Sequence, residues 1–394
     1  MTAAPSRATP TKCPRCFGIL DPNLYMWSSA PTSGSPRYYD AVASAFVGAK
    51  TDIGALFQWN RPTGYAGPPP ATHVASQVLR GPVVEICPVC HFALPDRWRD
   101  GQAYCIAMAG ARATGKSLYI GVLVKQLQLL CEQLGYAMEP ATRATAAAYA
   151  TDYETPLFVQ RGLLPPTPTV LTQTSTQREP LIFCLGFWHG LPRYLVLRDV
   201  AGEDLESGDL HDPPFRFFSN AEAVFFMFDP LRVKSIRDQL HDLLPPQMVS
   251  GGDPRTVLNN VIMAIGSGQP RLAVILSKFD ALRVLRDVEN SEWAMIMSNA
   301  GAAYLRDTSD APLYDDHDGQ LLHEEVRSLL VRLNAGSMVA AVENPSTPTR
   351  LRHRFFVVSS LGQPPTGQRL HVRGIAPFRC ADPVRWVTSS FGVL

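Results

Sequence analysis

The sequence has no marked excess of either charge, no long apolar run and no secretory signal. Its 36 Lys and Arg residues balance 35 Asp and Glu residues, so charge gives no reason to expect nucleic acid or an anionic membrane as an obligatory partner. The most apolar segments, 118–130 and 223–228, are short or contain a charge, whereas a membrane-spanning helix needs about 20 apolar residues. Residues 1–11 lack the apolar core of a signal peptide. We therefore expect a cytoplasmic protein without a membrane span.

Length and apolar content predict a folded protein of more than one unit. The chain has 394 residues, more than a usual single domain, and its hydrophobic fraction of 46% is sufficient for a large core. Near residue 100 a Gly, Pro and Ser-rich texture gives way to alternating apolar runs and helical patterns. The predicted division is a flexible leader at 1–12, a zinc-ribbon module with an insertion at 13–100, a P-loop domain at 101–375 with insertions at about 136–180 and 285–352, and a C-terminal extension at 376–394.

Four of the eight cysteines form two Cys-Pro-x-Cys knuckles. Cys13 and Cys16 form the first knuckle, and Cys87 and Cys90 form the second. Thiolates at this spacing on a tight turn can face one metal ion, so the two knuckles together suit one tetrahedral Cys₄ zinc site of structural type. Disulfides, which a reducing cytosol disfavours, and unliganded thiols are the alternatives. His91 directly follows the second knuckle and could replace a ligand, although a surface role is the simpler interpretation.

Beyond residue 100 the pattern is typical of an α/β protein. The candidate strands are 103–109, 181–188, 194–199, 223–228, 272–276 and 355–359, and the candidate helices are 116–134, 230–243, 256–265 and 320–333. Strands that alternate with helices predict a mostly parallel sheet covered on both faces. The expected fold is therefore a three-layer α/β sandwich of the P-loop NTPase type, beside a small N-terminal Cys₄ zinc-ribbon module.

Residues 110–117 read GARATGKS and match the phosphate-binding pattern GxxxxGK[ST] at every fixed position. Glycines allow the backbone amides to converge on phosphate, Lys116 supplies a positive charge near the β- and γ-phosphates, and Ser117 offers a hydroxyl to Mg²⁺. A predicted strand enters the loop and a predicted helix leaves it, as anion binding at a helix N-terminus requires. The predicted nucleotide contacts of this loop are Gly110, Ala111, Arg112, Ala113, Thr114, Gly115, Lys116 and Ser117.

Three further motifs follow in order, each after a predicted strand. Asp199-Val-Ala-Gly202 matches DxxG, in which the aspartate holds Mg²⁺ and the glycine amide senses the γ-phosphate; an ordinary acidic turn is the alternative. Ser277-Lys278-Phe-Asp280 is similar to the guanine-reading motif (N/T)KxD, and a helix N-cap is its alternative. The third is a Ser-Ala-type turn whose backbone would meet the guanine base, at Ser359, Ser360 and Leu361. Carboxyl ends of parallel strands share one edge of a sheet, where ligands bind.

With these motifs the chain resembles a TRAFAC-class, Ras-like GTPase domain over roughly residues 102–375. Together with the cysteine knuckles, the DVAGED segment and the strand that ends in Phe228-Asp229-Pro230, it is similar to the bacterial double-GTPase families predicted to act in GTPase-centred conflict or defence systems. The resemblance implies phosphate binding at 110–117, Mg²⁺ sensing at Asp199 and Gly202, and base reading at Lys278 and Asp280.

Two residues depart from the Ras-like pattern near the expected chemistry. Glu203 stands where such enzymes commonly have the glutamine that orients water; a carboxylate there could position water or repel the γ-phosphate. Arg112 stands where many small GTPases have glycine, and it could neutralise transition-state charge or simply point to solvent. We expect Lys116, Glu203 and Arg112 to be the catalytic set.

The threonine that would complete the Mg²⁺ site is ambiguous in sequence. Thr167 is the best candidate, with Thr169, Thr172 and Thr174 as competitors, and a Thr and Pro-rich loop needs no ligand at all. Arg161 lies upstream as a speculative second arginine finger. The expected Mg²⁺ ligands are therefore Ser117, Asp199 and Thr167.

The leading functional hypothesis is a GTP-binding switch that hydrolyses GTP with Mg²⁺ and acts on protein partners. An ATPase with the same loop, and an adaptor that binds nucleotide and zinc without hydrolysis, are the alternatives. A zinc-ribbon nucleic-acid binder is disfavoured by the neutral charge.

Overall fold

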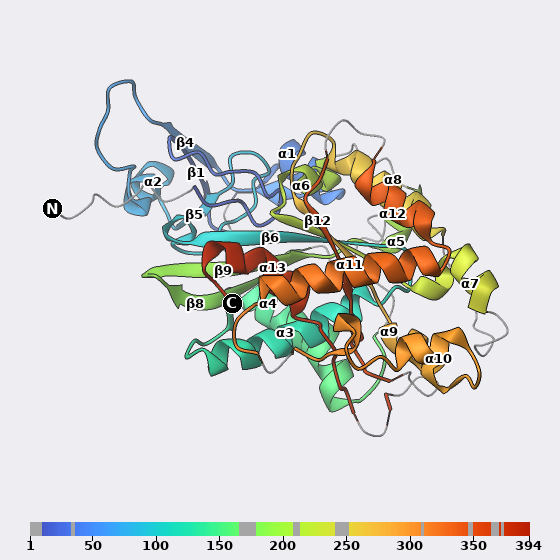
Figure 1. Ribbon diagram of the computed structural model, residues 1–394. Coiled ribbons are helices and arrows are strands. Elements are labelled where there is room, and N and C mark those ends of the chain that lie inside the picture. The colour runs from blue at the N-terminus through green and yellow to red at the C-terminus, as the bar shows by residue number, and fades with distance from the viewer. Residues whose placement is uncertain are drawn as a thin grey trace.

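The structure is a computed structural model of the chain (Figure 1). It describes residues 10–32, 36–164, 179–207, 213–240, 252–308, 311–345, 350–363, 370–371 and 374–394. The predicted leader therefore lies outside the described residues except at positions 10–12. The whole threonine-rich segment 167–174 also lies outside them.

A seven-stranded sheet forms the centre of the molecule, in the order β12-β11-β10-β6-β9-β8-β7. Its strands are β6 (Gln102–Ala109), β7 (Glu139–Pro140), β8 (Leu181–Trp188), β9 (Leu191–Arg198), β10 (Ala223–Phe228), β11 (Arg271–Leu276) and β12 (His353–Val357). The strands from β12 to β9 run parallel, while β8 and β7 pair antiparallel at the other edge. Strand β10 is buried along its whole length, as a strand covered on both faces must be, which explains its unbroken apolar sequence.

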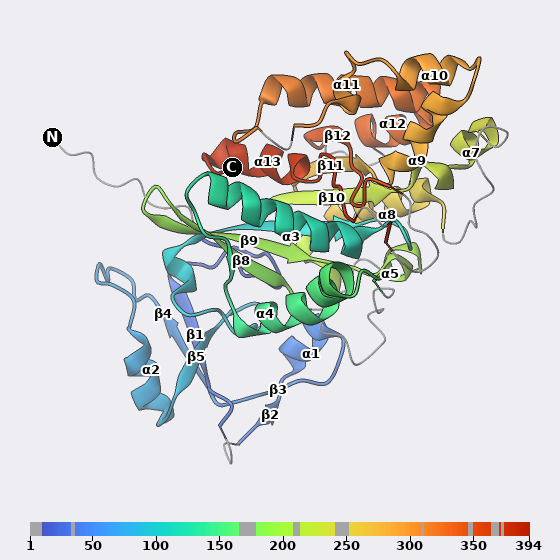
Figure 2. The same cartoon turned by 90° about the horizontal axis from the view of Figure 1, so that it is seen from below.

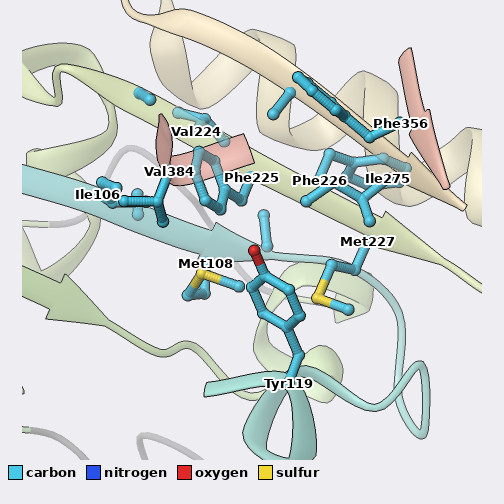
Figure 3. Packing of buried hydrophobic residues seen from close by; sticks show 14 of the residues in the cluster. Ile106, Met108, Tyr119, Val224, Phe225, Phe226, Met227, Ile275, Phe356 and Val384 are labelled. Atoms are coloured by element: carbon cyan, nitrogen blue, oxygen red, sulfur yellow. The ribbon is translucent and has the colours of Figure 1, made fainter. Parts of the chain in front are cut away.

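Helices cover both faces of this sheet. The α-helices of the described residues are α1 (Ala41–Val47), α2 (Thr72–Leu79), α3 (Lys116–Gln133), α4 (Arg143–Tyr149), α5 (Gly202–Ser207), α6 (Phe217–Asn220), α7 (Lys234–Leu240), α8 (Pro254–Ile265), α9 (Phe279–Arg283), α10 (Glu292–Met297), α11 (Asp316–Arg332), α12 (Gly336–Glu343) and α13 (Asp382–Thr388). Helix α3 lies on one face, and α8 and α12 lie on the other (Figure 1). Figure 3 shows the ring of Tyr119, from α3, pointing toward the strands between Met108 and Met227.

The N-terminal part forms a separate three-stranded antiparallel sheet in the order β4-β1-β5. Its strands are β1 (Leu24–Ser29), β4 (Leu56–Asn60) and β5 (Val83–Ile86), and a short pair, β2 (Tyr38–Tyr39) with β3 (Asp52–Ile53), lies beside it. The small sheet and α2 lie together at one end of the molecule (Figure 2). One face carries a row of aromatic rings, in which Tyr25 and Phe57 both stack on Trp27 at centroid distances of 5.8 and 5.7 Å.

Aromatic contacts join this N-terminal part to the large sheet. Trp98 stacks on Tyr194 of β9 with ring centroids 4.5 Å apart, and Phe17 meets Phe217 edge-on at 5.3 Å. At the other end of the chain, Trp386 of α13 is buried in the same continuous core. Residues 382–388 are therefore part of the main body.

The predicted α/β class with a mostly parallel sheet is confirmed, and most predicted strands agree with the observed ones to within three residues. The predicted helix 230–243 differs, because a single 3₁₀ turn at Pro230–Arg232 precedes α7. Asp229 caps that turn by accepting a hydrogen bond from the backbone amide of Leu231. Among the described residues, no helix is long and apolar enough to cross a bilayer.

Candidate functional site

The loop between β6 and α3 has the backbone shape that phosphate binding requires. Gly110, Ala113 and Gly115 adopt positive φ angles of 142°, 57° and 88°. A Cβ atom on Gly110 would lie 2.1 Å from the carbonyl oxygen of Met227, so no other residue fits beside β10. The eight predicted phosphate contacts, Gly110, Ala111, Arg112, Ala113, Thr114, Gly115, Lys116 and Ser117, form one continuous turn into the N-terminus of α3.

Lys116 is held inside this loop. Its side chain is 5% exposed, and Nζ donates to the carbonyl oxygens of Gly110 at 2.7 Å and Ala111 at 3.2 Å. Burial lowers the pKa of Lys116, while the nearby carboxylates of Asp199 and Glu203 oppose that shift. The ammonium group has three protons, so it can donate a further hydrogen bond toward an anion in the loop.

Two of the predicted Mg²⁺ ligands meet beside this loop. The Ser117 hydroxyl donates to Oδ2 of Asp199, the residue that directly follows β9, at 3.1 Å. A hydroxyl and a carboxylate in contact at the mouth of a phosphate loop are oxygen ligands of the kind that Mg²⁺ prefers. The third predicted ligand, Thr167, lies outside the described residues.

The DxxG segment packs directly against the phosphate loop. A Cβ atom on Gly202 would lie 2.2 Å from the backbone nitrogen of Arg112 and 2.6 Å from the carbonyl carbon of Ala111, so only glycine allows this approach. The Arg112 guanidinium forms an ion pair with Glu203, with Nε and Oε1 3.1 Å apart. The two residues predicted to assist hydrolysis therefore bind each other.

Glu206 is a further residue at this site, and the motifs did not indicate it. Its Oε1 accepts a hydrogen bond from the backbone amide of Arg112 at 3.0 Å. Glu206 lies three residues after Glu203 on α5, and residues at this spacing share one face of a helix. The spacing of the two glutamates could therefore have indicated Glu206 from the sequence.

A cavity of about 280 Å³ opens over the phosphate loop. It is lined by residues 112–118 of the loop and first turn of α3, by Leu163 and Leu164, and by Gly202 and Glu203. Arg161, the suggested second arginine finger, does not line it. The cavity thus combines a polar floor with an apolar side wall, as small-molecule sites commonly do.

The two predicted base-reading segments are brought together at the ends of β11 and β12. The hydroxyl of Ser359 donates to Oδ1 of Asp280 at 2.5 Å and also accepts from the amide of Gly362 at 2.9 Å. Ser277 donates from Oγ to the carbonyl oxygen of Phe228 at 3.0 Å, which braces the turn. Ser360 and Leu361 continue the same turn beyond β12.

Lys278 pairs with a residue at the end of a neighbouring strand. Its Nζ lies 2.8 Å from Oδ2 of Asp229, the residue at the end of β10. The sequence identified the strand that ends at Asp229, but not this partner, because the two residues are 49 positions apart and meet only in the sheet.

The four knuckle cysteines form one cluster. Their sulfur atoms all lie within 4.8 Å of one another, with Cys13 and Cys90 3.5 Å apart and Cys16 and Cys87 3.8 Å apart. Tetrahedral zinc with Zn–S bonds of about 2.3 Å places its sulfur ligands about 3.8 Å apart, so the donor set fits one zinc ion.

The two knuckles have the same local structure. In each, the first cysteine sulfur accepts a backbone amide at 3.4 Å, from Arg15 in one knuckle and Val89 in the other. The residues after the second cysteines, Phe17 and His91, both have positive φ angles, of 56° and 55°. The His91 ring instead contacts Asp40, the N-cap residue of α1, with Nδ1 and Oδ2 2.8 Å apart.

The first knuckle contacts the end of β9. Arg198 donates to the carbonyl oxygen of Arg15 and also lies 4.0 Å from the ring centroid of Phe217. Asn220 donates to the carbonyl oxygen of Cys16 at 3.2 Å. Since Arg198 directly precedes Asp199, adjacent residues of one strand end contact the cysteine cluster and the phosphate loop.

Comparisons with known proteins identify relatives of the chain. The model of the family "ESX-1 scaffolding and assembly protein SaeC N-terminal domain" matches residues 23–85. A protein of Mycolicibacterium smegmatis named "Putative ESX-1 scaffolding and assembly protein SaeC" is 71% identical over 384 residues, which is 98% of this chain and 100% of the relative.

Similar solved structures are more distant. The signal recognition particle receptor SRβ–GTP/SRX complex from Chaetomium thermophilum is 13% identical, with a TM-score of 0.25 over 66% of this chain and 94% of that chain. The GTP-bound Ski7 GTPase-like domain from S. cerevisiae is 11% identical, with a TM-score of 0.21 over 65% of this chain and 42% of that chain. Likenesses at these TM-scores support no conclusion.

The full-length relative corrects the functional prediction. The prediction of a GTP-hydrolysing switch, and with it the description as an NTP hydrolase or GTPase, was wrong, because a relative of this identity is named for scaffolding and assembly. The motifs that carried this prediction describe a loop and a fold, and a fold of this kind can serve more than one role. The chain belongs to the SaeC family of ESX-1 scaffolding and assembly proteins.

Proposed function

We propose that this protein is a scaffold in the assembly of an ESX-1-type secretion system, where it works through protein partners in the cytoplasm. The observation that carries the proposal is the 71% identity to the whole length of the M. smegmatis relative named for this role. Residues 23–85, which match the family model, form the small sheet and its neighbours. This part exposes large apolar side chains, with Tyr38 56% and Tyr39 62% exposed, as a surface for partners would.

The phosphate loop enters the proposal as a nucleotide-binding structural element in a three-layer fold of the P-loop NTPase type. Gly110–Ser117 would hold the phosphates, Ser117 and Asp199 would hold Mg²⁺ with Thr167 as the expected third ligand, and Asp280 would accept from a guanine base. Such a ligand would connect the ends of β6, β9, β11 and β12. A ligand that binds only the folded state stabilises it in proportion to the logarithm of its concentration over Kd. Of the resemblance to double-GTPase families, the proposal keeps only nucleotide binding.

The cysteine cluster enters the proposal as a structural zinc site. Cys13, Cys16, Cys87 and Cys90 would hold one ion, which links the two ends of the segment that contains the family-model region. Zinc in a closed Cys₄ site supplies folding free energy and no reaction chemistry. The scaffold surface at 23–85 would then be attached to the large sheet at a fixed point.

A deletion in the native host tests the scaffold role. We expect loss of secretion of ESX-1 substrates and loss of the assembled secretion complex on native gels, with both restored by the wild-type chain. Unchanged secretion and assembly in the deletion strain would refute the role.

Two Lys variants test nucleotide binding separately from the scaffold role. Lys116→Ala removes the phosphate-loop charge, whereas Lys125→Ala removes a lysine from the same helix that pairs with Glu154. We expect K116A to lose bound nucleotide, measured by chromatography of the nucleotide released on denaturation, and K125A to retain it. Nucleotide retained by K116A would refute the phosphate-loop assignment and leave the scaffold role standing.

A further inference from the structure

We infer that the phosphate loop selects a nucleoside diphosphate over a nucleoside triphosphate, through Gly202, Glu203 and Glu206 of α5. This inference rests on the proposal that the loop binds a nucleotide. It concerns how many phosphates the bound nucleotide carries.

The part of the loop that would hold the first two phosphates is open and preformed. Ala113 and Gly115 have the positive φ angles that turn successive amides toward one point, and the helix that follows adds its N-terminal amides. Lys116 is held at the loop by two carbonyl oxygens, and the cavity of about 280 Å³ lies over these residues.

On one side, the cavity is bounded by backbone that packs closely on the loop. Gly202 approaches so closely that a single added carbon atom would lie 2.2 Å from the Arg112 nitrogen. The resemblance to Ras-like domains places the third phosphate beside the DxxG glycine. A glycine packed on the loop backbone would then have to move before a third phosphate enters. Closely packed backbone of this kind gives way only at the cost of its contacts.

Two carboxylates add an electrostatic barrier on that side. Glu206 accepts the Arg112 amide at 3.0 Å, and Glu203 pairs with the Arg112 guanidinium at 3.1 Å. A third phosphate would bring further negative charge toward both carboxylates and would compete with them for Arg112. Juxtaposed like charges discriminate strongly against a ligand, and a site can obtain its selectivity from such repulsion alone.

Arg112 binds both carboxylates at once. Arg112 presents its backbone amide to one and its side chain to the other, so α5 is attached to the loop at two points. A diphosphate leaves both attachments in place, whereas a triphosphate must break them. The diphosphate complex is therefore the state in which α5 stays docked.

The test is the ratio of two affinities in the full-length chain. Binding of GDP and of a hydrolysis-resistant GTP analogue is measured by calorimetry with Mg²⁺, for wild type and for the double variant Glu203→Gln/Glu206→Gln. Glu289→Gln, which neutralises an exposed glutamate distant in sequence from the loop, is the matched control. We expect wild type and the control to bind GDP about tenfold or more tightly than the analogue. In the double variant the ratio falls by severalfold, because the analogue binds more tightly while GDP changes little.

A second measurement does not depend on calorimetry. Hydrogen exchange of the amides of 202–207 should slow with GDP and accelerate with the analogue in wild type. Equal affinities in wild type, or an unchanged ratio in the double variant, would overturn the selectivity. Absence of binding by every nucleotide would instead overturn the nucleotide proposal itself, and the inference with it.

Discussion

Nε of Arg112 lies 3.1 Å from Oε1 of Glu203, so a residue of the phosphate loop and the residue after the DxxG glycine are joined by charge. In a Ras-like enzyme these two positions flank the reacting phosphate. Here they form a contact that holds α5 against the loop.

The strength of that contact can be measured by a double-mutant cycle. The side chains are 52% and 33% exposed, so solvent screens the pair, and we expect a coupling of about 1 kcal/mol or less. Urea unfolding of R112A, E203A and the double variant gives the coupling free energy. The pair Arg97 and Asp100, more exposed at 80% and 54%, serves as a reference that should couple more weakly. A coupling of several kcal/mol would show that the contact is far less screened than its exposure indicates.

Removal of the cysteine cluster should cost far more. Cys13→Ser/Cys16→Ser leaves two ligands, so we expect one zinc ion per chain in wild type and almost none in the variant by metal analysis. Loss of a structural zinc site removes several kcal/mol of folding free energy, seen as a lower thermal midpoint. Cys184→Ser in β8, away from the cluster, should retain the metal. A wild-type protein purified without chelator that contains no zinc would contradict the assignment.

Asp280 should determine the choice of base. Its carboxylate is oriented by the Ser359 hydroxyl, and a carboxylate accepts from guanine N–H groups that adenine does not offer in the same arrangement. Asp280→Asn should reduce the ratio of GDP to ADP affinity by tenfold or more, since about 1.4 kcal/mol corresponds to each factor of ten. Ser359→Ala, which removes only the orienting hydroxyl, should have a smaller effect in the same direction. An unchanged ratio in D280N would refute guanine reading.

Two isolated thiols predict how stability depends on alkaline pH. Burial raises the pKa of Cys131 and of Cys380 from 9.0 to about 12. The folded state therefore keeps both thiols protonated while the unfolded state ionises, so their stabilising contribution is complete below about pH 9 and is lost as pH rises toward about 12. Urea midpoints measured from pH 8 to pH 10.5 should fall less steeply in Cys131→Ala/Cys380→Ala than in wild type. Parallel slopes would contradict the prediction.

An element could be predicted from the sequence where its pattern lies within one strand or one loop. Strand β10 is an unbroken apolar run, and β6 and β11 are apolar after one polar first residue each. The phosphate loop is a contiguous motif, so each of these elements could be recognised locally. The pairs Arg112–Glu203 and Lys278–Asp229 could not, because their partners are distant in sequence and meet only when the sheet is assembled.

The small sheet was also missed. Its strand β4 alternates between exposed and half-buried residues amid glycine and proline, and such a pattern does not distinguish a strand from a loop. Function was predicted from motifs of a fold that many roles share, and a relative along the whole chain corrected it.

The end of β9 has a consequence for genetics. Arg198 holds the backbone of the first cysteine knuckle, and its neighbour Asp199 accepts from the phosphate-loop serine. The residues that support the knuckle and the loop are therefore adjacent in sequence, although a mutational screen would treat the two sites as independent. Effects of substitutions add only when the altered residues do not share a support. Substitutions in the knuckle and substitutions in the loop should therefore have non-additive effects. A screen that altered only one of the two sites would not reveal that they share this support.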